Sequence, residues 1–155
     1  MKIKQTFFSL IMPIVKIYWK IIKPEAFGVK VLLTHPHETG KVLLVRHTYG
    51  NIKLWNIPGG GYNPKKENAE TAAAREVFEE LGVKVLNLKE IGIYQTSGEG
   101  KKDNVTIFSG TIEDIGNIKQ NPEISELSWD DSLTIPSRGE DVARVARRAV
   151  EKILS

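Results

Sequence analysis

The 155-residue sequence contains no cysteine, so this chain has neither a disulfide framework nor a thiolate metal site. It also lacks an uninterrupted apolar run of the length that a membrane-spanning helix needs. No internal repeat, low-complexity tract or interdomain linker divides it. The chain is nevertheless long enough to bury one sizeable core, and we expect a single cytoplasmic domain.

Basic and acidic residues are both common in this chain, but they are unevenly distributed along it. The first 30 residues hold six lysines against one glutamate, which is +5, and the remaining residues hold 16 basic against 18 acidic, which is −2. The net charge of +3 therefore reports a basic N-terminus on a slightly acidic domain. General nucleic-acid binding is not expected from this distribution.

Residues 1–23 combine a narrow lysine stripe with a wide apolar face, which predicts an amphipathic helix that Pro13 should kink. A cleaved signal peptide is not favoured, because no small-residue cleavage site follows and Lys16 interrupts the apolar run. An apolar face of this size is rarely left exposed to solvent, so some other surface should cover it. Three covers stay open: the domain itself, a second copy of the chain in a homodimer, or an anionic membrane surface, which would make the protein peripheral at the membrane.

The rest of the chain reads as strands around one central helix, followed by a terminal helix. The predicted strands are residues 27–35 and 41–48, joined as a hairpin, then 83–97, 104–113 and 124–129. A capping box at residues 137–140 predicts a last helix that runs to about Leu154. This order indicates an α/β or α+β sandwich.

The central helix should begin after Asn68 as its N-cap and end at Gly82. One face then holds an apolar stripe at helical spacing, made of Ala74, Val77, Phe78 and Leu81. The opposite face holds three carboxylates at i, i+3 and i+4, those of Glu76, Glu79 and Glu80. Such a trio is most often a solvated surface. It repels itself, however, and a hard divalent cation such as Mg²⁺ would relieve that repulsion.

The context of the three acids favours a metal site over a plain surface. The sequence reads Gly61, five residues, Glu67, seven residues, Arg75-Glu76-Val77, one residue, Glu79-Glu80, one residue, Gly82-Val83. This pattern is the complete Nudix box, and the chain therefore resembles the Nudix hydrolases. The resemblance implies the Nudix fold, a mixed β-sheet sandwiched between α-helices, over residues 24–155, with residues 1–23 as an addition.

The resemblance also implies a chemistry. Nudix enzymes cleave a pyrophosphate bond in a nucleoside diphosphate linked to another group, using Mg²⁺ or Mn²⁺, so a small-molecule nucleotide is the expected substrate. Glu76, Glu79 and Glu80 would bind the metal, and Glu76 or Glu79 would orient or deprotonate the attacking water. Arg75 would pair with box carboxylates. The backbone carbonyl of Gly60 would be a further metal ligand, with Gly59 as an equal alternative.

Other site residues are open at this stage. Gly59, Gly60 and Gly61 let backbone approach a ligand closely. Arg46 would meet substrate phosphate or be a plain strand arginine, and Trp55 would line a base pocket or pack in the core. A further acid is expected from a later loop, with Glu99, Glu123 and Glu126 as candidates. His35, His37 and His47 lack zinc-site spacing and should be solvent-exposed. The competing class is a non-catalytic nucleotide-binding Nudix sensor or regulatory module.

Overall fold

A computed structural model describes residues 25–98 and 101–155 of the chain. The predicted N-terminal helix and Glu99 lie outside these residues. None of the helices in the described part is long and apolar enough to cross a membrane. The elements are β1 (Glu25–Thr34), β2 (Lys41–His47), β3 (Gly61–Tyr62), α2 (Ala69–Leu81), β4 (Val85–Gly98), β5 (Lys101–Ile112), η1 (Ile115–Asn117), β6 (Ile124–Asp131), η2 (Ile135–Asp141) and α3 (Arg144–Leu154).

The strands form one mixed sheet in the order β4-β5-β1-β2-β6, with β3 paired to β1. β1 and β5 are parallel along the whole of β1, and the other neighbours are antiparallel. β1 and β2 are consecutive and antiparallel, as predicted for a hairpin, but they pair only near their turn, at Thr34 and Val42. Beyond the turn β2 pairs with β6 instead, so the two hairpin strands separate.

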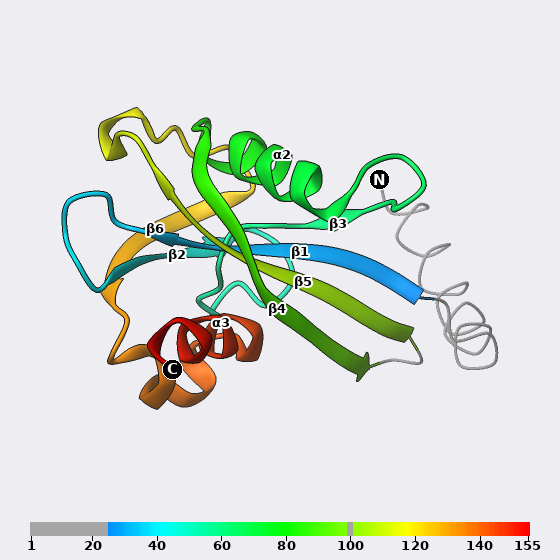
Figure 1. The fold of residues 1–155 in the computed structure, drawn as a ribbon. Coiled ribbons are helices and arrows are strands. Elements are labelled where there is room, and N and C mark those ends of the chain that lie inside the picture. The colour runs from blue at the N-terminus through cyan, green and yellow to red at the C-terminus, as the bar shows by residue number, and fades with distance from the viewer. Residues whose placement is uncertain (1–24, 99–100) are drawn as a thin grey trace, which may run out of the picture.

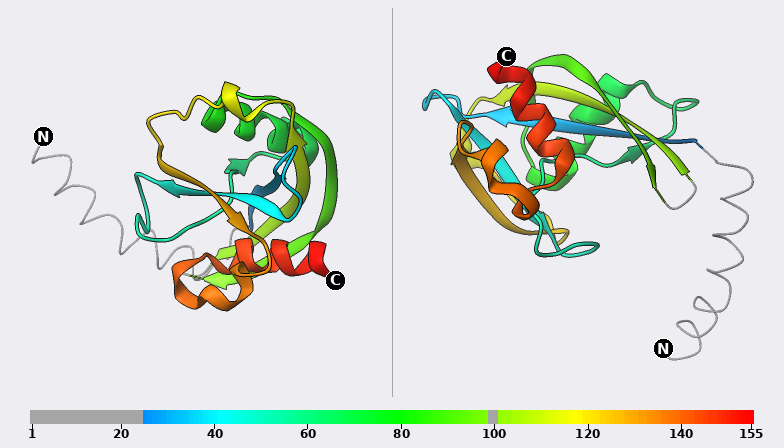
Figure 2. Two further views of the ribbon diagram at one scale, coloured as in Figure 1. Left: turned by 90° about the vertical axis from the view of Figure 1, so that its left-hand side faces the viewer. Right: turned by 90° about the horizontal axis from the view of Figure 1, so that it is seen from below.

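The sheet lies between α2 on one face and α3 on the other (Figures 1 and 2), which confirms the predicted sandwich of a mixed sheet between helices. Side chains of β1 alternate between two cores, as the period of a strand requires. Val29 and Val31 pack in the core under α2, whereas Leu32 packs in the core under α3. The same alternation places Lys30, in the middle of β1, on the α3 side of the sheet together with Leu32.

Both predicted ends of the central helix are confirmed. The Asn68 side chain accepts a hydrogen bond from the Thr71 backbone N–H at 2.8 Å, which satisfies one of the free donors of the first turn. Gly82 ends α2 in the left-handed conformation with φ 68°, and its N–H donates to the Phe78 carbonyl.

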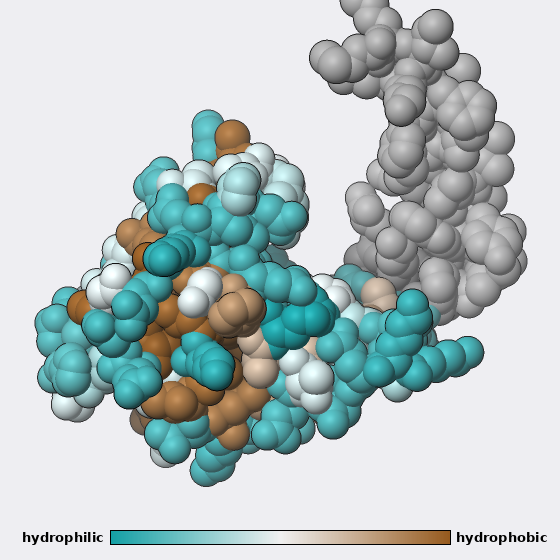
Figure 3. All heavy atoms as spheres, turned by 90° about the horizontal axis from the view of Figure 1, so that it is seen from above, coloured by the Kyte–Doolittle hydropathy of each residue, from teal (hydrophilic) through white to brown (hydrophobic). Residues whose placement is uncertain are grey.

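The predicted apolar stripe of α2 is confirmed at Val77 and Leu81, which are fully buried, and wrong at Phe78, which is 55% exposed. The buried residues of the helix are Ala72, Ala73, Val77, Glu80 and Leu81. Two adjacent alanines let the helix approach the strands closely, so the buried face is centred nearer to them than to Ala74. Hydrophobic side chains accordingly remain exposed on the side of the molecule that α2 covers (Figure 3).

The predicted capping box near the C-terminus is also wrong. The Ser137 hydroxyl donates to the Thr134 carbonyl instead of capping a helix, and residues 135–141 form the 3₁₀ helix η2. Gly139, with φ 60° and ψ −128°, interrupts this segment. The final helix α3 therefore starts only at Arg144, and no side chain caps its first turn.

Backbone hydrogen bonds attach the start of α3 to the loop that leads into the glycine run. The Trp55 N–H donates to the Asp141 carbonyl at 3.0 Å, and the Ala143 N–H donates to the Trp55 carbonyl at 2.7 Å. The first turn of α3 is thus fixed relative to residues 57–60, although the two segments are far apart in sequence.

Candidate active site

The loop of residues 57–60 is held by three consecutive residues of β1, and each of its four carbonyls accepts a hydrogen bond from them. The bonds run from Val31 N to Pro58 O (2.9 Å), from Val29 N to Gly60 O (2.9 Å), and from Lys30 Nζ to Ile57 O (3.0 Å) and Gly59 O (2.8 Å). A loop whose carbonyls are all bound to one strand has little freedom to move. It presents the glycines to α2 in a fixed position.

Glycine is required at two positions of this loop. Gly59 has φ +130°, and a Cβ there would lie 2.2 Å from the Val29 carbonyl oxygen. A Cβ on Gly60 would lie 2.6 Å from a carboxylate oxygen of Glu76. The close approach that the sequence predicts for these glycines is therefore an approach to β1 for Gly59 and to the acidic face of α2 for Gly60.

Lys30 is a site residue that the sequence analysis missed. Burial lowers the pKa of its ammonium below the ordinary value, and the nearby carboxylates of Glu80 and Glu76 oppose that shift. A charged side chain so placed is rare unless it is bound by partners, and the partners here are the two loop carbonyls. A lysine on the same strand face as the buried Leu32 was the signal that could have identified it.

Glu80 and His47 form a buried pair, which corrects two predictions. Glu80 is only 2% exposed and therefore does not share a solvated face with the other two acids. His47, predicted to be exposed, is 9% exposed, and its Nε2 donates to Glu80 Oε1 at 3.0 Å. The other oxygen of Glu80 accepts from the Gly59 N–H at 3.0 Å. Glu80 thus joins β2 and the glycine loop to α2.

His35 corrects the same prediction, because its side chain is only 4% exposed. Its Nδ1 accepts hydrogen bonds from the backbone N–H groups of His37 and Glu38, at 3.1 and 2.9 Å. His35 therefore organises the turn after β1, whereas His37 is exposed as expected.

Arg75 lies among three carboxylates. It donates two hydrogen bonds to Glu67, at 2.8 and 3.2 Å, one to Glu76 at 2.8 Å and one to Glu79 at 3.1 Å. These contacts, with the hydrogen bonds to Glu67 as the main cause, raise the pKa of the Arg75 guanidinium above its ordinary value. The arginine therefore stays charged and ties the loop before α2 to the helix.

Arg75→Ala should lower the free energy of unfolding by about 1–2 kcal/mol, or the melting temperature by roughly 3–6 °C. The loss is limited because the Arg75 side chain is 34% exposed and solvent screens its ion pairs. Thermal unfolding followed by circular dichroism measures it. Arg148→Ala is the matched control, since among the described residues Arg148 pairs with Glu151 alone, at the surface, and its loss should shift the melting temperature far less. Equal shifts in the two variants would contradict the bridging role.

Negative charge is in excess around Glu76 and Tyr49. Burial is the main cause that raises the pKa of Glu76, and Glu80 and Glu79 add to it, while Arg75 opposes it. The pKa of the Tyr49 hydroxyl is also raised, first by burial and then by Glu123, Glu80 and Glu76. A cation placed beside these groups would relieve both effects.

The acids do not form a finished metal cage within residues 25–98 and 101–155, where no three His, Asp or Glu side chains converge on one point. The contacts explain why: Arg75 binds Glu76 and Glu79, and His47 binds Glu80. Glu76 Oε2 and Glu79 Oε1 have no hydrogen-bond partner in the described part of the chain. The donor set consists of hard oxygens in a region of negative charge, which fits Mg²⁺ or Mn²⁺.

The two candidate backbone ligands differ in what they already bind. The Gly59 carbonyl accepts from the Lys30 ammonium, so a divalent ion there would stand beside another cation. The Gly60 carbonyl accepts from a neutral backbone N–H and keeps its second lone pair. This difference favours Gly60.

Arg46 and Trp55 contact each other rather than the glycine loop. The Arg46 guanidinium lies 4.3 Å from the centre of the Trp55 ring and also pairs with Glu126 at 3.2 Å. Trp55 packs against the core under α3. Of the candidate acids from later loops, Glu126 is therefore engaged by Arg46, whereas Glu123 is close enough to raise the pKa of Tyr49.

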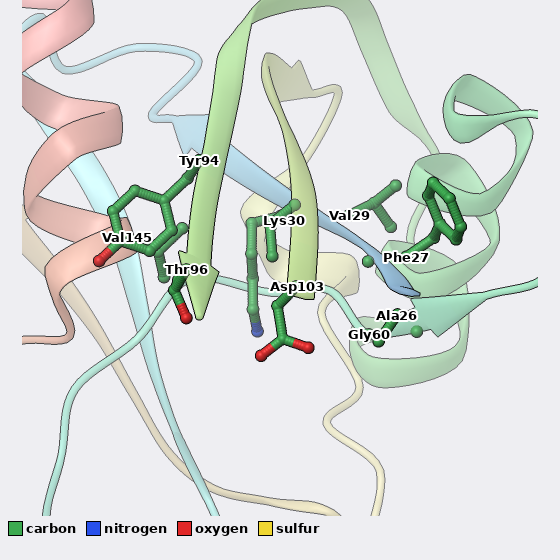
Figure 4. Close-up of a pocket in the computed structure, with 12 residues that line it drawn as sticks. Ala26, Phe27, Val29, Lys30, Gly60, Tyr94, Thr96, Asp103 and Val145 are labelled. Carbon is green, nitrogen blue, oxygen red and sulfur yellow. The ribbon is translucent and has the colours of Figure 1, made fainter. Parts of the chain in front are cut away.

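Two cavities share Lys30 and Gly60 as lining residues. Figure 4 shows the first of them. The first has a volume of about 320 Å³ and lies at the open ends of β1, β4 and β5. The second has a volume of about 340 Å³ and lies beside His47. Side chains that line the first include Phe27, Tyr94, Thr96, Asp103 and Val145, and those that line the second include His47, Tyr49, Asn51 and Asn56.

Comparison with known proteins adds a family to this geometry. The family model described as the NUDIX domain matches residues 24–151. Over 93 residues the chain is 33% identical to a candidate 8-oxo-dGTP diphosphatase of Bacillus subtilis (strain 168), covering 60% of this chain and 59% of the relative. It is also 33% identical over 86 residues to diphosphoinositol polyphosphate phosphohydrolase 3-alpha of Mus musculus, covering 56% of this chain and 45% of the relative.

Among solved structures, a MutT protein from Methanosarcina mazei Go1 superimposes with a TM-score of 0.67 at 26% identity, covering 84% of this chain and 93% of that one. Such agreement over most of both chains supports the same fold. The chain spans roughly half the length of the two sequence relatives.

Proposed function

The chain belongs to the NUDIX domain family, and on that premise we propose that it is a metal-dependent hydrolase of phosphorus anhydrides. Its substrate would be a small molecule of the nucleotide class, namely a nucleotide sugar, a dinucleotide or a nucleoside triphosphate. Water would attack phosphorus, and the diphosphate linkage would be cleaved. The observation that supports this most is the Glu76 carboxylate packed against the backbone of Gly60, between two cavities.

Glu76, Glu79 and the Gly60 carbonyl would hold Mg²⁺ or Mn²⁺, with Glu80 as a further ligand if it leaves His47. When bound, the metal supplies charge neutralisation on the diphosphate and a more acidic water. The protein's own contribution is positional. Arg75 holds Glu76 and Glu79 at fixed places on α2, and Lys30 holds the glycine loop facing them.

The first cavity suits a nucleoside. Its volume is at the lower end of the range for small-molecule sites, and it offers the aromatic rings of Phe27 and Tyr94. Asp103 and Thr96 add an acceptor and a hydroxyl, which would bind polar groups of a base (Figure 4). A nucleoside there would have its 5′-diphosphate beside Gly60, next to Glu76.

Glu123 is the better candidate for the additional acid. It lies near Tyr49, which lines the second cavity together with His47. Glu126, by contrast, is paired with Arg46. We assign Glu123 to the acidic set of the site and Glu126 to the support of Arg46.

The competing function is a non-catalytic nucleotide sensor. The complete set of box acids favours the hydrolase. A panel of nucleotide sugars, dinucleotides, ADP-ribose and dNTPs, incubated with Mg²⁺ and analysed for phosphate-bearing products, separates the two. We expect cleavage of at least one class, abolished by EDTA and restored by excess Mg²⁺. Inactivity on the whole panel, together with tight metal-independent nucleotide binding, would instead establish the sensor.

A further inference from the structure

Three arginines lie on one face of α3, over its first two turns. Arg144, Arg147 and Arg148 follow the i, i+3, i+4 spacing that places side chains together on a helix. They line a cavity of about 370 Å³ together with Tyr94 and Glu151. One glutamate faces three arginines, so the cavity has an excess of positive charge.

This positive charge is not balanced within the part of the chain that the structure describes. Arg148 pairs with Glu151 at 2.9 Å, whereas Arg144 and Arg147 form no ion pair with any described residue. Arg144 is also the first residue of α3, where the helix dipole favours an anion. The first turn of α3 contains no acidic residue and has no side-chain cap. An anion in this cavity would relieve each of these costs.

The arginine cavity adjoins the proposed nucleoside cavity. Tyr94 lines both, and Val145 of α3 faces the nucleoside cavity while its neighbour Arg144 faces the arginine cavity. Figure 4 shows Tyr94 on the side of the nucleoside cavity that is nearest to α3. A ligand that extends from Gly60 through the first cavity would therefore reach the arginines beyond Tyr94.

We propose that Arg144, Arg147 and Arg148 form a subsite for a second phosphate group of the substrate, separate from the diphosphate that is cleaved. The proposal rests on the proposed function, because it places a nucleoside in the cavity between the two phosphate positions. Arginine suits this task, since its guanidinium binds phosphate through two parallel hydrogen bonds. The substrate class is thereby narrowed to nucleotides with a phosphate monoester on the ribose.

Two pairs of compounds test the subsite, NADPH with NADH and coenzyme A with dephospho-coenzyme A. Each pair differs by one phosphate monoester on the adenosine ribose. Binding to the full chain is measured by calorimetry in EDTA, so that no turnover occurs. The phosphorylated member of at least one pair should bind about tenfold more tightly, the effect of one charge-assisted contact, and the preference should weaken with salt.

The double variant Arg144→Gln with Arg147→Gln should reduce this preference to less than about twofold. Its melting temperature should not fall, because neither arginine forms an ion pair with a described residue and the charge of Arg144 opposes the helix dipole. The control is Lys89→Gln with Lys152→Gln, which removes two positive charges outside the cavity and should keep the preference. The proposal is overturned if wild-type protein prefers neither phosphorylated compound, or if the preference survives the loss of both arginines. A retained preference with no cleavage of the substrate panel would refute the hydrolase alone.

Discussion

Glu76→Gln should lower kcat on the best substrate of the panel by on the order of 10³-fold, the largest effect expected from a single carboxamide replacement in this chain. Glu76 is the carboxylate that packs against Gly60, and its second oxygen has no hydrogen-bond partner in the described part of the chain. Glutamine keeps the size of the side chain and removes its charge. The loss should therefore appear in turnover, with the shape of the site preserved.

The thermal stability of Glu76→Gln, unlike its turnover, should be equal to or slightly higher than that of wild-type protein. Burial raises the pKa of Glu76, so the folded protein favours the protonated side chain more than the unfolded chain does. Stability linked to this group is thus present below the unfolded pKa and is lost as the pH rises through the folded pKa. Glutamine resembles the protonated form, and Glu76→Gln should consequently leave the melting temperature at pH 7 unchanged or slightly higher.

The metal response gives an independent measurement. Excess Mg²⁺ should raise the melting temperature of wild-type protein, because a ligand that binds only the folded state stabilises it, and the rise should be much smaller in Glu76→Gln. Glu70→Gln is the control, since Glu70 lies exposed in the first turn of the same helix. Activity within tenfold of wild type and an unchanged Mg²⁺ response would place the metal away from Glu76.

The position and ends of α2 were predictable because local chemistry determines them. Asn68 caps the first turn through its own side chain, and Gly82 takes a backbone conformation that other residues adopt at a cost. The spacing of the box acids likewise requires no knowledge of the fold. These features depend on residues that are close in sequence, where the rules of helix formation apply directly.

The orientation of α2 was not predictable from periodicity, because a second apolar stripe competes with the first. Ala73, Val77 and Leu81 match a helical face as well as the stripe that includes Phe78 does. The choice between them depends on the sheet, to which the alanines allow a close approach. The same rotation buries Glu80 and brings it to His47, a partner 33 residues away in sequence. Long-range pairs of this kind leave little local trace.

The start of α3 shows a different limit. Ser137 and Glu140 have the spacing of a capping box, yet Gly139 between them adopts φ 60° and ends the 3₁₀ turn. The bonds between Trp55 and the residues around Val142 then fix where the helix begins. A local capping signal was therefore overridden by pairing with a loop from the middle of the chain.

Lys30→Met should destabilise the protein more than any other single change proposed for this site, by about 2–4 kcal/mol. Methionine has a similar length and no donor, so the carbonyls of Ile57 and Gly59 would lose the only hydrogen bonds they accept within the described residues. The cost is partly offset because the buried ammonium is itself poorly solvated, as its lowered pKa indicates. The melting temperature should fall by about 5–12 °C.

Activity should decline even well below the melting temperature. Lys30 holds Gly59, and the next residue, Gly60, faces Glu76 with its backbone. A looser loop would misplace the Gly60 carbonyl relative to the carboxylate, so kcat at 20 °C should drop by roughly 10–100-fold, the effect typical of residues that support a metal ligand. The Mg²⁺-induced rise in melting temperature should shrink as well, which a purely structural lysine would not cause.

Lys89→Met provides the matched control, because Lys89 is exposed on β4, where it pairs with Ser109 of β5. It should leave the melting temperature and kcat close to wild type. If Lys30→Met instead unfolded at the wild-type temperature, the backbone hydrogen bonds from Val29 and Val31 would suffice to hold the glycine loop, and Lys30 would not be its support. If the melting temperature fell but kcat at 20 °C and the Mg²⁺ response did not, Lys30 would stabilise the fold without positioning Gly60. Only the combined loss is consistent with a β1 residue that fixes the glycine loop against the acids of α2.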